Sequence, residues 1–73
     1  MKKIVDKIFL DIFSLKKKDL NINLNSKNLK TWDSLNHVRL IVSLEKKFKT
    51  KIKNSDIIKL NSIKKIYNYF KSR

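Results

Sequence analysis

The sequence predicts an all-α protein: a small four-helix bundle with three longer helices, one short helix and a long loop between helices 1 and 2. One observation supports the helical class and a second supports a single small domain. Apolar residues recur at intervals of three and four in three separate segments, which is the spacing of one face of an α-helix. The chain has 73 residues, a length at which a single domain buries only about 60% of its unfolded surface. We therefore expect residues 1–73 to form one domain.

The first predicted helix covers residues 2–14, in which apolar and charged side chains alternate with a helical period. Its apolar face is expected to pack into the core. Asp6, Lys7 and Asp11 interrupt the apolar positions, so this segment is not expected to be a signal sequence. The residues of the apolar face are Ile4, Val5, Ile8, Phe9, Ile12 and Phe13.

Residues 15–33 have no helical period and are rich in Asn, Ser and Lys. Apolar and polar residues alternate over part of this segment, as in a strand, but only the surroundings of Ile52 offer a pairing partner and a lone two-stranded ribbon is marginal. We predict a loop, in which Asn residues adopt the left-handed backbone conformation that glycine usually supplies. The apolar residues expected to pin this loop to the core are Leu20, Ile22, Leu24 and Leu29.

A second helix is predicted to begin at Ser34. Asp33 precedes it as a good N-cap, because its carboxylate can accept a hydrogen bond from the amide of Asn36. Trp32 and His37 occupy the two positions of a hydrophobic staple, which fixes how the chain enters the helix. Ser34 is then the first helical residue, and its hydroxyl should face solvent.

This helix has two apolar strips. The first contains the residues expected to face the core, and the second lies next to Ser34. The second strip is either part of a wide interior or a surface for partners. The first strip holds Leu40, Ile41, Leu44 and Phe48, with His37 one turn from the start, and the second holds Leu35, Val38 and Val42.

Two more helices are expected after residue 53. Asn54, Ser55 and Asp56 should cap a short turn of helix. Asn61 and Ser62 should start the last helix, whose apolar residues have spacings of three and four. These residues are Ile63, Ile66, Tyr67 and Phe70.

The second helix and its start, residues 32–48, read WDSLNHVRLIVSLEKKF. This segment resembles the modification site and second helix of the acyl carrier protein family. The resemblance is carried by the triplet Asp33-Ser34-Leu35 at a helix start and by Leu44-Glu45-x-x-Phe48 at the helix end. It extends over nearly the whole chain, because the predicted order of helices and the long first loop also match.

The resemblance implies a carrier protein that is not itself an enzyme. Ser34 would carry 4′-phosphopantetheine, covalently attached from coenzyme A by a phosphopantetheinyl transferase that uses magnesium. Acyl or aminoacyl groups would be bound to the thiol of this arm as thioesters and passed between acyl- or aminoacyl-loading and acyl-using enzymes. Asp33 and Leu35 would complete the attachment motif.

The resemblance also divides the second helix into two roles. The residues implied in partner docking are Leu35, Val38, Arg39, Val42 and Glu45. The residues implied in lining the interior, where an acyl chain could lodge, are His37, Val38, Leu40, Ile41, Leu44 and Phe48.

Other chemistry is poorly supported. The chain has no cysteine, so any thioester needs an imported sulfur. Ser34 and His37 stand three residues apart, but no third residue orients the imidazole as in a nucleophile and base pair. No cluster of potential metal ligands is recognisable. With no run of about 20 apolar residues, we expect a soluble, cytoplasmic protein with no stable membrane insertion. We also expect a monomer.

The net charge of +13 is unusual for the family that the chain resembles, whose members are usually acidic. It leaves two alternatives open: a basic helical module that binds nucleic acid, or one that binds anionic membrane surfaces. The lysines are spread over every segment, so no specific nucleic-acid site is expected. Lys49 also replaces the family's common glycine after the second helix, which suggests another cap geometry.

Overall fold

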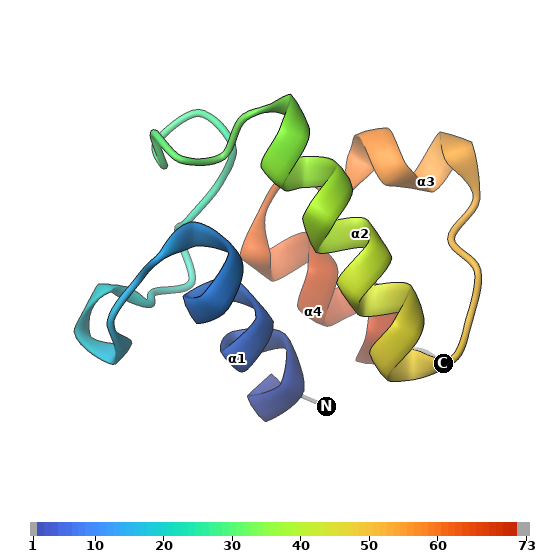
Figure 1. Ribbon diagram of the computed structural model, residues 1–73, viewed down its shortest axis with the longest axis horizontal. Helices are drawn as coiled ribbons and strands as arrows, with labels where there is room; N and C mark the ends of the chain where they lie inside the picture. Colours follow the sequence, from blue (N-terminus) through green and yellow to red (C-terminus); the bar gives the residue numbers. More distant parts are fainter. Residues whose placement is uncertain (1, 72–73) are drawn as a thin grey trace.

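The computed structural model describes residues 2–71. They form three longer helices, one short helix and one turn of 3-10 helix, which confirms the predicted all-α bundle (Figure 1). Within this part of the chain, the only strand-like pairing is an isolated bridge between Asn25 and Ser62. The elements are α1 (Lys2–Phe13), η1 (Lys17–Asp19), α2 (Ser34–Phe48), α3 (Asn54–Lys59) and α4 (Ile63–Lys71).

The core lies where α1, α2 and α4 meet, since α1 contacts both other long helices. Phe9, Leu40, Leu44 and Ile66 are completely buried there. Phe48, near the end of α2, stacks on Phe70 of α4 with ring centroids 4.1 Å apart. In the view of Figure 1, the short helix α3 lies on the other side of α2 from α1. The apolar faces predicted from the sequence therefore meet in one core, except for Ile4 of α1, which is 39% exposed.

The end of α2 corrects one expectation. Lys49 adopts the left-handed conformation, with φ 50° and ψ 49°, and the amides of Lys49 and Thr50 both donate to the carbonyl oxygen of Glu45. This is the helix ending that glycine usually provides, so the prediction of another cap geometry was wrong. A non-glycine residue can take this conformation at a modest cost. Ser14 ends α1 with a similar φ of 54°.

The asparagines of the first loop do not act as predicted. Among residues 2–71 only Ser14 and Lys49 have a positive φ, so no asparagine of the loop adopts the left-handed conformation. Instead, the Asn25 side-chain oxygen accepts hydrogen bonds from the amides of Lys27 and Asn28, at 2.8 and 3.1 Å. These side chains stabilise turns by bonding to nearby backbone, the other way in which asparagine favours a turn.

Three of the four predicted apolar anchors hold the loop to the core. Leu24 is buried, and Leu20 and Leu29 are partly buried against the core. Ile22 is 50% exposed, so its predicted role was wrong. The amide of Leu24 donates to the carbonyl oxygen of Asn21 at 3.2 Å, which places Ile22 at the corner of a turn with its side chain in solvent.

The loop pairs with the connection between α3 and α4. The amide of Ser26 donates to the carbonyl oxygen of Asn61 at 2.9 Å, and the amide of Ile63 donates to the carbonyl oxygen of Leu24 at 3.0 Å. The backbone of the loop thus has partners at a place where the sequence pattern did not predict any. This pairing fixes the segment that leads toward α2.

The two last helices begin differently. Lys53 is the N-cap of α3 and no side chain caps that helix, so the predicted caps from residues 54–56 do not form. In α4, the hydroxyl of Ser62 accepts a hydrogen bond from the amide of Lys65 at 3.1 Å, as expected of a capping serine. The short helix α3 is therefore weakly capped in comparison with α2 and α4.

Candidate functional site

The N-terminus of α2 is built as the sequence predicted. Asp33 has an extended backbone, and its carboxylate accepts a hydrogen bond from the amide of Asn36 at 2.9 Å. Ser34 is the first residue of the helix, and its side chain is exposed. Asp33 therefore holds the first turn in place and leaves the Ser34 hydroxyl open to solvent.

The segment that enters α2 is hydrogen-bonded both to the first turn of α2 and to the end of α1. The side-chain amide of Asn36 donates to the carbonyl oxygen of Thr31 at 2.8 Å. The hydroxyl of Thr31 donates to the carbonyl oxygen of Phe13, the last residue of α1, at 3.4 Å. These contacts position the start of α2 relative to the end of α1.

Trp32 and His37 form the predicted staple, with a hydrogen bond added to it. The Trp32 Nε1–H donates to Nδ1 of His37 at 3.0 Å, and the two rings are stacked with centroids 6.1 Å apart. On its other side, Trp32 packs against Phe9 and Phe13. The start of α2 is therefore anchored to α1 through a buried indole ring.

The second nitrogen of His37 bonds to α3. Its Nε2 lies 2.8 Å from the carbonyl oxygen of Ile57. Because an indole N–H can only donate, Nδ1 must be unprotonated and Nε2 must carry the proton that is donated to Ile57. Both nitrogens are thus engaged, and neither is free to accept a proton from Ser34. This geometry gives no support to a serine and histidine pair for hydrolysis.

The two apolar strips of α2 separate into buried and exposed residues. Leu40, Ile41 and Leu44 are buried, whereas the exposed fractions of Leu35 and Val42 are 62% and 42%.

Val38 belongs to the exposed strip. It was expected both at the surface and in the interior, and the structure leaves 58% of it exposed. His37 and Phe48 are half-buried. Val38 therefore does not line the interior in this structure, while the other predicted interior residues of α2 are at least half-buried.

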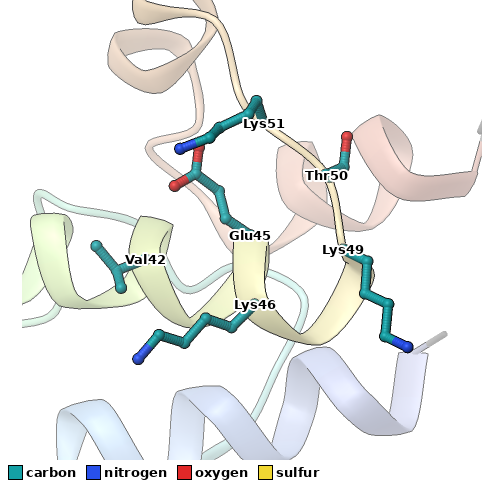
Figure 2. Close-up of a pocket in the computed structure, with 6 residues that line it drawn as sticks. All are labelled: Val42, Glu45, Lys46, Lys49, Thr50 and Lys51. Carbon is teal, nitrogen blue, oxygen red and sulfur yellow. The ribbon is translucent and has the colours of Figure 1, made fainter.

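Glu45 has a structural partner that the sequence did not reveal. Its carboxylate accepts a hydrogen bond from the amide of Ile52 at 2.8 Å, which closes the turn after α2. The same turn borders a shallow groove of about 620 Å³, shown in Figure 2. Sequence reasoning missed this groove, because it forms between a helix end and a loop. The residues that line it are Val42, Glu45, Lys46, Lys49, Thr50 and Lys51.

A second open depression, of about 570 Å³, lies beside Ser34. It brings together the end of the first loop, the start of α2, Ile58 of α3 and the connection after α3. Ile58 was not predicted as a site residue, although an exposed fraction of 78% makes it the most exposed large apolar side chain described. The lining residues are Ser26, Trp32, Asp33, Ser34, His37, Val38, Ile58 and Asn61.

The start of α2 suits a phosphate ester. Within residues 2–71, the backbone amides of Ser34 and Leu35 have no hydrogen-bond partner, while Asp33 already accepts from Asn36. Free amides and the helix dipole both favour negative charge at a helix N-terminus. A phosphodiester on the Ser34 hydroxyl would lie in this field.

The described part of the chain has no group of three or more His, Cys, Asp or Glu residues that could hold one metal ion. None of the helices in residues 2–71 is long and apolar enough to cross a lipid bilayer.

The comparison with family models shows that the chain is a carrier protein, a helical domain that bears a prosthetic group. A family model described as "Phosphopantetheine attachment site" matches residues 5–70. The chain therefore belongs to the phosphopantetheine attachment site family, whose members carry covalently attached 4′-phosphopantetheine. These domains are carriers and not catalysts, and they interact with phosphopantetheinyl transferases and partner enzymes. A comparison with curated proteins found no match.

Proposed function

We propose that Ser34 is the attachment residue of this carrier. The observation that carries the proposal is the exposed Ser34 hydroxyl on the first residue of α2, with Asp33 capping the helix beside it. In the proposed reaction, the hydroxyl oxygen attacks the phosphorus of coenzyme A that bears the pantetheine. A P–O bond to serine forms, the bond to the second phosphate breaks, and adenosine 3′,5′-bisphosphate leaves. The transferase removes the serine proton.

The chain's own residues prepare this step without catalysing it. Asp33 fixes the first turn of α2 and so limits the positions that the Ser34 hydroxyl can take. By analogy with the family, Asp33 would help to present the serine or contact the transferase's metal. Leu35, which follows the serine and is exposed, would contact the transferase surface.

The loaded arm supplies the thiol that this cysteine-free chain lacks. Acyl or aminoacyl groups would form thioesters with this thiol and pass between loading and acyl-using enzymes. Fatty-acid, polyketide, aminoacyl and sugar-modifying acyl pathways all use chemistry of this kind. For an acyl cargo, the interior of the bundle is the proposed shelter, lined by His37, Leu40, Ile41, Leu44 and Phe48.

The proposal is tested by mass spectrometry of the full chain after incubation with coenzyme A, magnesium and a broad-specificity transferase. The expected result is a gain equal to one phosphopantetheine group, which Ser34→Ala abolishes. Ser55→Ala is the matched control, because Ser55 is an exposed serine on α3 and its variant should still gain the group. If several transferases leave the wild-type mass unchanged, the carrier proposal fails.

A further inference from the structure

The outward face of α2 carries apolar side chains that the bundle does not cover. Leu35, Val38 and Val42 have exposed fractions between 42% and 62%, and they begin one residue after Ser34. Ile58 on α3 borders the same depression as Ser34 and Val38. Exposed apolar residues gathered on one face of a small protein mark an interaction site.

Cationic side chains lie among these apolar residues. At 100° per residue, Arg39 and Lys46 project within an arc of about 60° that also contains Leu35 and Val42. Both cations are exposed. Figure 2 shows Lys46 and Lys49 extending from the end of α2 on the side away from Glu45. The exposed face is therefore both apolar and basic.

The two carboxylates of this region offset its positive charge only in part, because Arg39, Lys46, Lys47 and Lys49 outnumber Asp33 and Glu45. Asp33 accepts the amide of Asn36, and Glu45 accepts the amide of Ile52. Each is committed to a contact that stabilises an end of α2. Glu45, which was expected in partner docking, thus points toward the following loop instead of the exposed strip.

We propose that this face, formed by Leu35, Val38, Arg39, Val42 and Lys46 and here called the docking face, binds partner enzymes whose matching surface is acidic around an apolar pocket. The inference rests on the proposed carrier function and adds the chemical class of the partner. A basic partner surface would meet Arg39 and Lys46 with like charge, which lowers affinity and slows encounter. The net charge of +13 extends the same preference to long range.

The test uses the full-length apo chain as substrate for two phosphopantetheinyl transferases. They are chosen so that the surface receiving the carrier is acidic in one enzyme and basic in the other. The docking-face variant is Arg39→Glu/Lys46→Glu. The control is Lys64→Glu/Lys65→Glu, which makes the same change in net charge on exposed positions of α4. Circular dichroism checks that each variant is folded.

With the acidic-surfaced enzyme, the docking-face variant should lower kcat/KM by about tenfold or more relative to the control variant. With the basic-surfaced enzyme, the same variant should raise kcat/KM above that of the wild type. Val42→Ser should lower kcat/KM with both enzymes, because it removes apolar contact and no charge. Added salt should reduce the differences that depend on charge.

The outcomes separate this inference from the proposed function. If the wild type is modified but the docking-face variant behaves like the control variant with both enzymes, the docking inference is wrong and the carrier function stands. If neither enzyme modifies the wild type, both are wrong. Vesicles of phosphatidylserine and phosphatidylcholine test whether the docking face binds a membrane surface instead of a partner enzyme. Loss of vesicle binding in the docking-face variant, with transferase kinetics equal to the control, would make this face a membrane-binding surface and overturn the inference.

Discussion

Replacing His37 by phenylalanine tests how the start of α2 is held to α3. The variant keeps an aromatic ring beside Trp32 but removes the acceptor at 3.0 Å from the indole nitrogen and the donor at 2.8 Å from the Ile57 carbonyl oxygen. Each hydrogen bond contributes about 0.5–1.5 kcal/mol. Trp32 is only 6% exposed, so its N–H, left unpaired in the variant, would be poorly hydrated. The free energy lost for each bond should therefore lie near the middle or top of that range.

We therefore expect His37→Phe to lower the free energy of unfolding by about 2 kcal/mol, which lowers Tm by about 8–16 °C for a domain of this size. Urea unfolding is followed by circular dichroism and by the fluorescence of Trp32, the one tryptophan of the chain. His37→Asn, which can retain the acceptor for Trp32, and His37→Gln, which can retain the donor to Ile57, should each lose about half as much.

Val38→Ala serves as the control, since an exposed neighbour on the same helix should change stability by about 0.5 kcal/mol or less. A loss for His37→Phe no larger than this control would show that the two hydrogen bonds do not stabilise the fold. A double-mutant cycle with Trp32→Phe isolates the first of the two bonds. A coupling energy near zero would refute the role given to the indole N–H.

Further predictions concern helix ends, pH and salt. Ser14→Gly and Lys49→Gly should each raise the free energy of unfolding by about 0.5–1 kcal/mol, because glycine takes the left-handed conformation without the penalty of a Cβ; urea unfolding measures the change, and destabilisation would contradict the assigned caps. Partial burial, the hydrogen bond to Asp6 and the Asp6 charge together raise the pKa of the Tyr67 hydroxyl above its usual range. The folded protein then holds this proton more tightly than the unfolded chain. The contribution of the Tyr67 hydroxyl to the free energy of unfolding is therefore complete below about pH 10 and declines as the pH rises further. The stability difference between wild type and Tyr67→Phe should accordingly shrink above that pH, and a constant difference would count against it. Added salt should raise Tm by screening the repulsion within a chain of net charge +13; a Tm that falls in sodium chloride would show that favourable ion pairs dominate instead.

The helices and the start of α2 were predictable because their signals are local. Apolar spacing identified the buried faces of α1, α2 and α4, and Asp33 lies at the N-cap with the hydrogen bond that its side chain predicts. The contact between Trp32 and His37 was also predictable, because both lie within one turn of the same helix start. Local chemistry decides such features before tertiary packing intervenes.

The remaining features depend on contacts distant in sequence or on competition between equivalent solutions. His37 reaches a carbonyl 20 residues away, and Glu45 is drawn into the turn at Ile52. No spacing rule indicates either partner. Lys49 is left-handed because the hydrogen bonds to Glu45 outweigh the cost of its Cβ, a balance that composition does not reveal. The asparagines had two ways to support a turn, and the pattern could not distinguish them.

The bond from His37 to Ile57 has a consequence for cargo. Leu40 and Leu44 are wholly enclosed, so a long hydrocarbon tail needs a gap to open before it can reach them. Among the described residues, the imidazole supplies the hydrogen bond that joins the helix bearing Ser34 directly to α3. In the proposed carrier, separating α2 from α3 to admit such a tail would break this hydrogen bond. A short acyl group would stay in solvent with the hydrogen bond between His37 and Ile57 intact. A longer chain would enter the bundle only if its burial contributed more free energy than breaking this bond costs.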